Sequence, residues 1–262
     1  ADQRRYAVDD EAPRHYIDLD HYETLAPIDT MPMQWDSAVA KYSEATLLEY
    51  GIVPWHIMKV KAWLTKAMKE RDYEKIIKLS ADLGHYIADA HVPLHTTENY
   101  NGQLTNQHGI HGLWESRLPE IFATKYDFYT GKAVYLHAPL STIWQTVAES
   151  FAAKDSVLAM ERELTLRMPN TKYSFESKGA TTVKVYSRDF SSAYHSALNQ
   201  MVERRMKKAI FMVGCFWYTA WVDAGQPDLE FTVKQRIDLQ PQLDSLAKLM
   251  QSETIKGRME TH

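Results

Sequence analysis

Apolar positions recur with the three-to-four-residue spacing of amphipathic helices over most of the chain that follows residue 33. Gly51 with Pro54, and Gly225 with Pro227, supply ordinary helix stop signals between or after these stretches. Pro119 is expected to kink or shorten the helix that contains it. The pattern predicts an all-α fold with helices over residues 34–50, 55–69, 72–91, 112–125, 141–167, 191–222 and 240–255.

Two segments lack the helical period. Residues 1–32 are rich in charge, Tyr and Pro and predict a long irregular N-terminal arm, with a short extended piece over residues 15–22. Residues 171–188 predict a loop excursion that holds an extended piece near residues 181–186. No linker or internal repeat interrupts the pattern, so residues 1–262 are expected to form a single domain.

The stretch from His85 to Glu115 concentrates side chains that bind metals. His85 and Asp89 are four residues apart, as are His111 and Glu115, so on a helix each pair projects from one face and can hold one ion. His95 follows Pro93, which cannot continue the first helix. A loop at residues 99–103, reading NYNGQ, lets the second pair return toward the first.

These ligand types narrow the choice of metal. Histidine and carboxylate without thiolate suit zinc, or less selectively manganese or iron. A single pair of this kind usually lies exposed on a helix and binds no metal. Two pairs with a third histidine between them favour a metal site. His56, His137 and His195 lack partners at this spacing and are expected to be structural.

Charge and cysteine content limit the function classes. A formal net charge of −4 over 262 residues offers no broad basic surface, which argues against a protein that binds duplex nucleic acid. The longest mainly apolar segment, residues 210–222, is too short to span a membrane. Cys215 is the only cysteine, so an internal disulfide is excluded.

The ligand pattern resembles the superfamily that joins zinc-dependent phospholipases C with trinuclear-zinc single-strand-specific nucleases. Those enzymes are all-helical, with three zinc ions in one cleft. Their hallmark is His, three residues, Asp, then Pro-Leu-His, a loop, and His, three residues, Asp or Glu. The matching positions here are His85, Asp89, Pro93-Leu94-His95, His111 and Glu115.

The N-terminal arm adds two fragments that resemble the nucleases: Asp2 with Arg5, and His15-Tyr16-Ile17-Asp18. The resemblance implies catalytic roles for Asp2, Arg5 and Asp89, and a bridge from Asp89 to a third zinc. It implies contacts of Tyr16 and Asp18 with substrate, against the plainer alternative of a buried ring and a solvated carboxylate. The implied zinc ligands are Asp2, His15, His85 and Asp89 at one ion, and His95, His111 and Glu115 at the second.

Two departures from the family pattern bear on function. The family's third zinc uses the amino end of an N-terminal Trp, so either the true start lies upstream of Ala1 or the third site is incomplete. Glu115 and the short interval between His95 and His111 resemble phospholipase C, whereas the arm resembles the nucleases. We therefore expect two zinc ions, with a third if upstream residues supply ligands.

The expected activity is hydrolysis of a phosphodiester by zinc-activated water, because zinc lowers the pKa of bound water and neutralises phosphate charge. A phospholipid is the first expected substrate, and single-stranded nucleic acid is the alternative. A third alternative is that zinc only holds a helical scaffold together. Four protein ligands per ion, with no open position for water, would indicate such a structural site. The resemblance also implies a secreted or periplasmic protein.

Overall fold

The computed structural model describes residues 4, 8, 10–22, 27–179 and 181–229. Within these residues the chain is mostly helical, and its strands form one two-stranded antiparallel hairpin. The predicted all-α character is confirmed at that level. Among the same residues, no helix combines the length and the apolar character needed to cross a membrane.

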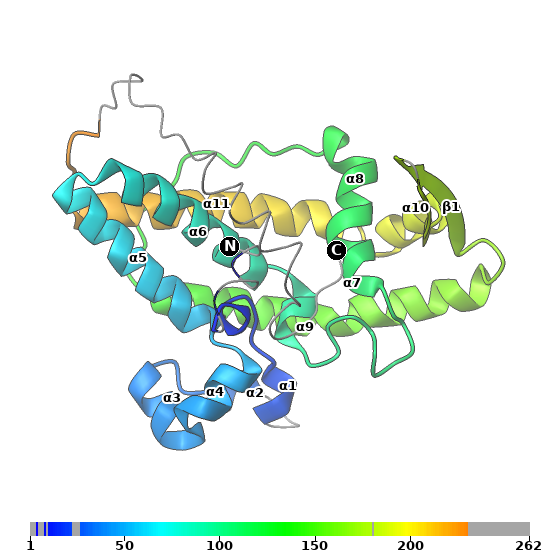
Figure 1. Cartoon of the computed structure of the whole chain (residues 1–262), viewed down its shortest axis with the longest axis horizontal. Coiled ribbons are helices and arrows are strands. Elements are labelled where there is room, and N and C mark those ends of the chain that lie inside the picture. Colours follow the sequence, from blue (N-terminus) through cyan, green and yellow to red (C-terminus); the bar gives the residue numbers. More distant parts are fainter. Residues whose placement is uncertain (1–3, 5–7, 9, 23–26, 180, 230–262) are drawn as a thin grey trace.

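Four long helices build the centre of the molecule: α5 (Val53–Glu70), α6 (Tyr73–Ala90), α9 (Pro139–Arg167) and α11 (Met201–Asp223). α5 packs against α6 and α9, and α11 lies along both α5 and α6 (Figure 1). Fully buried apolar side chains from these helices, such as Ile57, Leu64, Leu83, Ile87, Trp144 and Phe216, form one continuous core. Their burial from water is the main stabilising contribution to this arrangement.

The tight turn between α5 and α6 explains why these helices run side by side. Arg71 ends α5 in the left-handed conformation, with φ of 54°. Asp72 then caps α6, because its side chain accepts a hydrogen bond of 3.2 Å from the backbone N–H of Lys75. The turn places the C-terminal half of α6, which carries His85 and Asp89, beside the N-terminal arm.

The described part of the arm contains short helical turns: η2 (Ala12–Arg14), α1 (Leu19–Tyr22) and α2 (Pro27–Thr30). The extended piece predicted over residues 15–22 is wrong in its second half, where α1 forms. Ile17 and Leu19 are both fully buried, so the local alternation of apolar and polar residues reflects core packing and not a strand. The backbone N–H of Asp18 donates to the Tyr50 carbonyl at 2.7 Å and ties the arm to the helical body.

Two predicted helices are each divided in the structure. Residues 34–50 form α3 (Trp35–Tyr42) and α4 (Glu44–Tyr50), separated at Ser43, which has φ of 71° and caps α4. Residues 191–222 were predicted as one helix but belong to α10 (Arg188–Ala197) and α11. The break follows from Asn199 and Gln200, whose φ angles of 49° and 51° cannot continue a right-handed helix.

The excursion before α10 is a β-hairpin of β1 (Tyr173–Lys178) and β2 (Thr181–Tyr186), paired in antiparallel register. The predicted extended piece at residues 181–186 is confirmed, while its partner strand carries too few apolar residues to have been predicted. Gly179, with φ of 60°, lies in the turn. The helix predicted at residues 240–255 lies outside the described residues.

The second ligand segment is a composite helix of α7 (Ile110–Gly112), the π-helical turn η4 (Leu113–Arg117), α8 (Leu118–Phe122) and the 3-10 turn η5 (Ala123–Lys125). The N–H of Leu118 donates to the Leu113 carbonyl, which is a π-type hydrogen bond. Pro119 has no N–H for the carbonyl of Glu115, so a regular α-turn would lose that bond. The expected distortion at Pro119 is therefore a widened turn next to Glu115.

A pH-dependent stability prediction follows from His56 in α5, which is 5% exposed. Burial, together with the positive charges of Arg14 and Lys59, lowers the pKa of His56 to about 3. The unfolded chain, with a pKa of about 6.5, binds this proton more readily, so stability falls as pH decreases from about 6.5 toward 3. The expected contribution of His56 to this fall between pH 7 and pH 5 is about 2 kcal/mol.

Urea unfolding of the wild type and His56→Gln at both pH values, with chelator present throughout, measures this contribution. The substitution removes the titrating ring, so the difference in unfolding free energy between the two proteins should change by about 2 kcal/mol. A difference independent of pH would show that His56 does not titrate as its burial indicates.

Candidate metal centre

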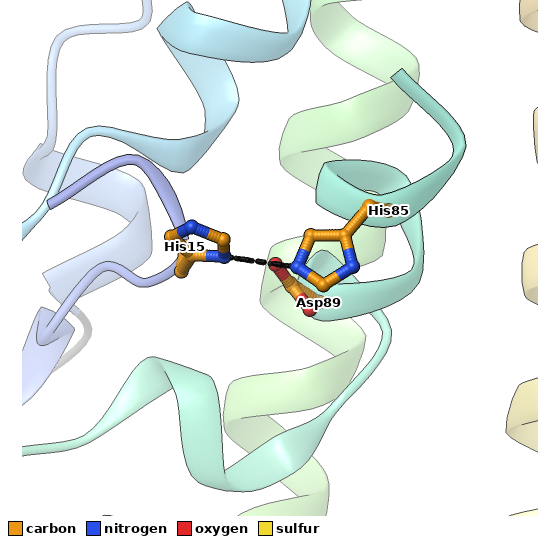
Figure 2. A group of neighbouring side chains, drawn as sticks. All are labelled: His15, His85 and Asp89. Carbon is orange, nitrogen blue, oxygen red and sulfur yellow. Dashed lines mark hydrogen bonds and ion pairs between the residues drawn. The ribbon is translucent and has the colours of Figure 1, made fainter. Parts of the chain in front are cut away.

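The arm and α6 bring three metal-binding side chains together. His15 Nδ1 lies 2.9 Å from Asp89 Oδ2 and 3.1 Å from His85 Nε2, and the last two atoms are 3.3 Å apart. Figure 2 shows the three side chains converging, with His15 on the arm and the other two on one face of α6. Ligands about 2.1 Å from a tetrahedral zinc lie about 3.4 Å apart, so this triangle has the size of one face of a coordination shell.

The donor chemistry of the first group is compatible with a metal ion between its side chains. His15 is fully buried and Asp89 is 8% exposed, whereas His85 retains partial exposure. The second nitrogen of His15, Nε2, faces the Glu11 carboxylate at 3.5 Å. When that nitrogen carries the proton, the lone pair of Nδ1 points at the Asp89 carboxylate, and a metal between the two relieves their repulsion.

The second group consists of His95, His111 and Glu115. The two Glu115 carboxylate oxygens lie 3.0 Å from His95 Nε2 and 3.0 Å from His111 Nε2, respectively. His95 and His111 are buried, and their ring centroids are 5.1 Å apart. Burial works to raise the pKa of Glu115, but His111 and His95, when they carry a second proton, outweigh it through their charges and hydrogen bonds and lower that pKa well below its usual range.

Backbone carbonyls set the orientation of both imidazoles in the second group. His95 Nδ1 is 2.7 Å from the carbonyl of His15, and His111 Nδ1 is 3.2 Å from the carbonyl of Tyr100. A carbonyl only accepts, so each Nδ1 carries the proton, and each Nε2 presents a lone pair to Glu115 unless a second proton is bound. A metal ion fits this arrangement of three acceptors.

The two groups are tied to each other through the same short backbone segment. The Ile17 N–H donates to the His95 carbonyl at 2.9 Å, while His95 Nδ1 donates to the His15 carbonyl. His95 itself lies in η3 (Pro93–Thr96), the 3-10 turn directly after α6. A shift of the arm would therefore disturb both groups at once.

The loop between His95 and His111 is held by its own side chains. The Asn101 side-chain oxygen accepts from the backbone N–H of Gly109 at 3.0 Å and of His111 at 3.4 Å. Gly102 has φ of 71°, and a Cβ there would meet the Gln107 carbonyl oxygen at 2.4 Å. The predicted loop at residues 99–103 is thus a fixed support for His111.

Six of the seven predicted ligands lie in two groups, with His15, His85 and Asp89 in the first and His95, His111 and Glu115 in the second. Asp2 and Arg5 lie outside the described residues. His56, His137 and His195 belong to neither group among the residues that the structure describes.

Tyr16 and Asp18, the residues predicted to contact substrate, are both buried. Tyr16 is 5% exposed and its hydroxyl donates to the Glu49 carbonyl at 3.2 Å. Asp18 is 7% exposed. A substrate contact of either residue stays a prediction.

Two features of the site escaped the sequence reasoning. Glu11 is fully buried beside His15. The sequence signal was an acidic residue four positions before a ligand histidine. It was missed because the arm was predicted to be irregular, so the helical spacing was not considered there. A pocket of about 250 Å³ also adjoins both groups, since Asp89 and Glu115 line it with Val92, Trp114, Val202 and Met206. No local pattern could have indicated that α6, η4 and α11 meet there.

Comparison with known proteins adds no relative: no family model, no curated protein and no solved structure matches this chain. What the chain itself carries is two groups of three His, Asp or Glu side chains, each of which could hold a metal ion.

Proposed function

We propose that this protein is a zinc-dependent phosphodiesterase of the phospholipase C type. The observation that carries the proposal is the pair of largely buried ligand groups, in which histidine ring nitrogens converge on the carboxylates of Asp89 and Glu115. The resemblance of the ligand spacing to the zinc phospholipases C and single-strand-specific nucleases supports the same reading.

The ligand set supports zinc over other ions. Each group combines two histidines with one carboxylate, a set that zinc hydrolases use with an open position for water. A structural zinc site has four protein ligands, whereas the second group offers three among the residues described. Three ligands favour catalysis over a scaffold role.

Zinc bound at such sites supplies an activated water at neutral pH and neutralises phosphate charge. The chain's own residues hold the ligands ready for that task. The carbonyls of His15 and Tyr100 orient the His95 and His111 imidazoles, so no reorientation is needed when substrate binds. Asp89 has a second carboxylate oxygen with which it could reach a further ion, and Asp2 and Arg5 keep their proposed catalytic roles.

The substrate class is proposed from what surrounds the groups. The neighbouring pocket is lined mainly by apolar side chains, including Val92, Trp114 and Met206, which suits an apolar part of a substrate. The burial of Tyr16 leaves little ring surface for stacking on a nucleobase of a nucleic-acid substrate. A phospholipid therefore remains the first choice, and the formal net charge of −4 offers polyanions little attraction.

Metal analysis and parallel rate measurements test the proposal. The purified protein should contain at least two zinc ions and should release phosphocholine from phosphatidylcholine micelles, with single-stranded DNA cleaved more slowly. Chelation should abolish both activities and added zinc should restore them. Rapid DNA cleavage without phosphocholine release would replace the phospholipid by nucleic acid, and absence of bound metal would reject the proposal altogether.

A further inference from the structure

We propose that Glu11 is a positioning residue for the first metal group, holding the His15 imidazole so that Nδ1 faces His85 and Asp89. This inference rests on the metal binding required by the proposed function. The relevant geometry is a line of side chains in which Glu11 Oε1 lies 3.5 Å from His15 Nε2, and His15 Nδ1 lies 2.9 Å from Asp89 Oδ2. A carboxylate behind a ligand histidine fixes the tautomer and orientation of the ring.

Glu11 is fully buried, which is costly for a carboxylate unless its charge is compensated. Oε1 accepts hydrogen bonds from Arg4 Nε at 3.1 Å, Arg4 Nη2 at 3.0 Å and the Tyr86 hydroxyl at 2.5 Å, and Oε2 accepts from Arg14 Nη1 at 2.6 Å. The positive charges of the Arg4 and Arg14 guanidinium groups, both hydrogen-bonded to this carboxylate, compensate its charge in the buried site. Glu11 therefore keeps a fixed negative charge beside His15.

The same cluster connects the arm to the helix that carries the other two ligands. Arg4 Nη1 also binds Asp82 of α6 at 2.8 Å, one turn before Tyr86. The Tyr86 ring lies edge-on to His15, with centroids 5.1 Å apart, and edge-on to His85, with centroids 5.8 Å apart. The ring of His15 is thus confined on one side by Tyr86 and at Nε2 by Glu11.

The location of the Glu11 carboxylate, next to a ring nitrogen of His15, distinguishes a positioning role from a purely structural one. Arg4, Arg14 and Tyr86 alone would satisfy both carboxylate oxygens, and the cluster could hold the arm without approaching a ligand. Instead the carboxylate lies against the one ring nitrogen of His15 that faces away from Asp89. Loss of the charge should loosen the choice between Nδ1 and Nε2 as the metal-facing atom.

The test is the zinc affinity of each group in Glu11→Gln, measured by competition with a chromogenic chelator. The first group should bind zinc roughly 10- to 100-fold more weakly, while the second group keeps the wild-type affinity. Asp223→Asn is the control, because Asp223 is an acid at the end of α11 that pairs with Lys61 and Tyr135, and neither of these residues belongs to a metal group. It should lower stability without changing either affinity.

A second readout is the imidazole tautomer of His15 in ¹⁵N-histidine spectra of the zinc-loaded protein, assigned with His15→Gln. The wild type should carry the proton on Nε2, and Glu11→Gln should show a mixture of tautomers. If Glu11→Gln does not fold, Glu11→Asp keeps the charge for the arginines but withdraws it from Nε2, and the same weakening is expected.

Unchanged affinity and tautomer in a folded Glu11 variant would overturn the positioning role while leaving the proposed function intact. A wild-type protein that binds no zinc would instead reject the proposed function itself.

Discussion

Asp89→Asn is expected to lower metal-dependent phosphodiester hydrolysis by more than about 100-fold. Loss of an outer-shell partner of a metal ligand already costs up to about 100-fold, and Asp89 is proposed as a ligand itself. The substitution keeps the shape of the side chain but removes the negative charge that faces His15 and His85 at 2.9 Å and 3.3 Å. The first group would then retain its two imidazoles and lose its only carboxylate among the described residues.

Steady-state rates on a generic phosphodiester, with zinc content and helical circular dichroism measured in parallel, check this prediction. Asp155→Asn is the control, since Asp155 is an exposed acid on α9 that pairs only with the neighbouring Lys154 among the interactions described. The control should keep wild-type rates, and both variants should keep the helical signal. Full activity of Asp89→Asn, or of the chelated wild type, would reject a metal mechanism at this group.

Gly51→Ala should have the largest effect on stability, a loss of about 3 kcal/mol in the free energy of unfolding. Gly51 has φ of 97° and ψ of 150°, a backbone region that residues with a Cβ avoid. A Cβ would also lie 2.1 Å from the Tyr16 carbonyl oxygen and 2.6 Å from the Tyr16 ring. The backbone of the arm must move to admit the methyl group.

That movement should reach the metal centre. The Ile52 N–H donates to the Pro13 carbonyl at 2.7 Å and the Val53 N–H to the Tyr16 carbonyl at 3.2 Å, so residues on both sides of His15 are tied to the Gly51 turn. The Gly51→Ala protein should therefore also bind zinc more weakly. Because the His15 carbonyl orients His95, the second group should weaken with the first.

Urea unfolding with chelator present separates the stability loss from the metal effect, and zinc competition then measures each group. Gly214→Ala is the control, because Gly214 lies within α11 and an added Cβ meets only the Ala133 Cβ, at an ordinary 3.5 Å. It should be neutral or slightly stabilising, since alanine favours helices. A Gly51→Ala protein as stable as the wild type would show that the arm gives way at little cost.

The helical character and the ligand pairs within single elements could be predicted from the amino-acid sequence. Apolar spacing indicated the long central helices, and the intervals from His85 to Asp89 and from His111 to Glu115 placed each pair on one face. These features depend on residues three or four apart, where helix geometry alone sets which side chains meet. The helix breaks at Ser43 and at Asn199 were missed because positive φ angles leave little trace in hydrophobic spacing.

The pairing of elements in each metal group, and the contacts that orient each ligand, became visible only in the three-dimensional fold. His15 joins a pair 70 residues away, His95 meets Glu115 across a loop, and Glu11 with Arg4 closes around Tyr86 of α6. The π-turn at Glu115 and the pocket against α11 likewise depend on how helices pack. Contacts of this kind are set by the burial of the whole core, which no local pattern encodes.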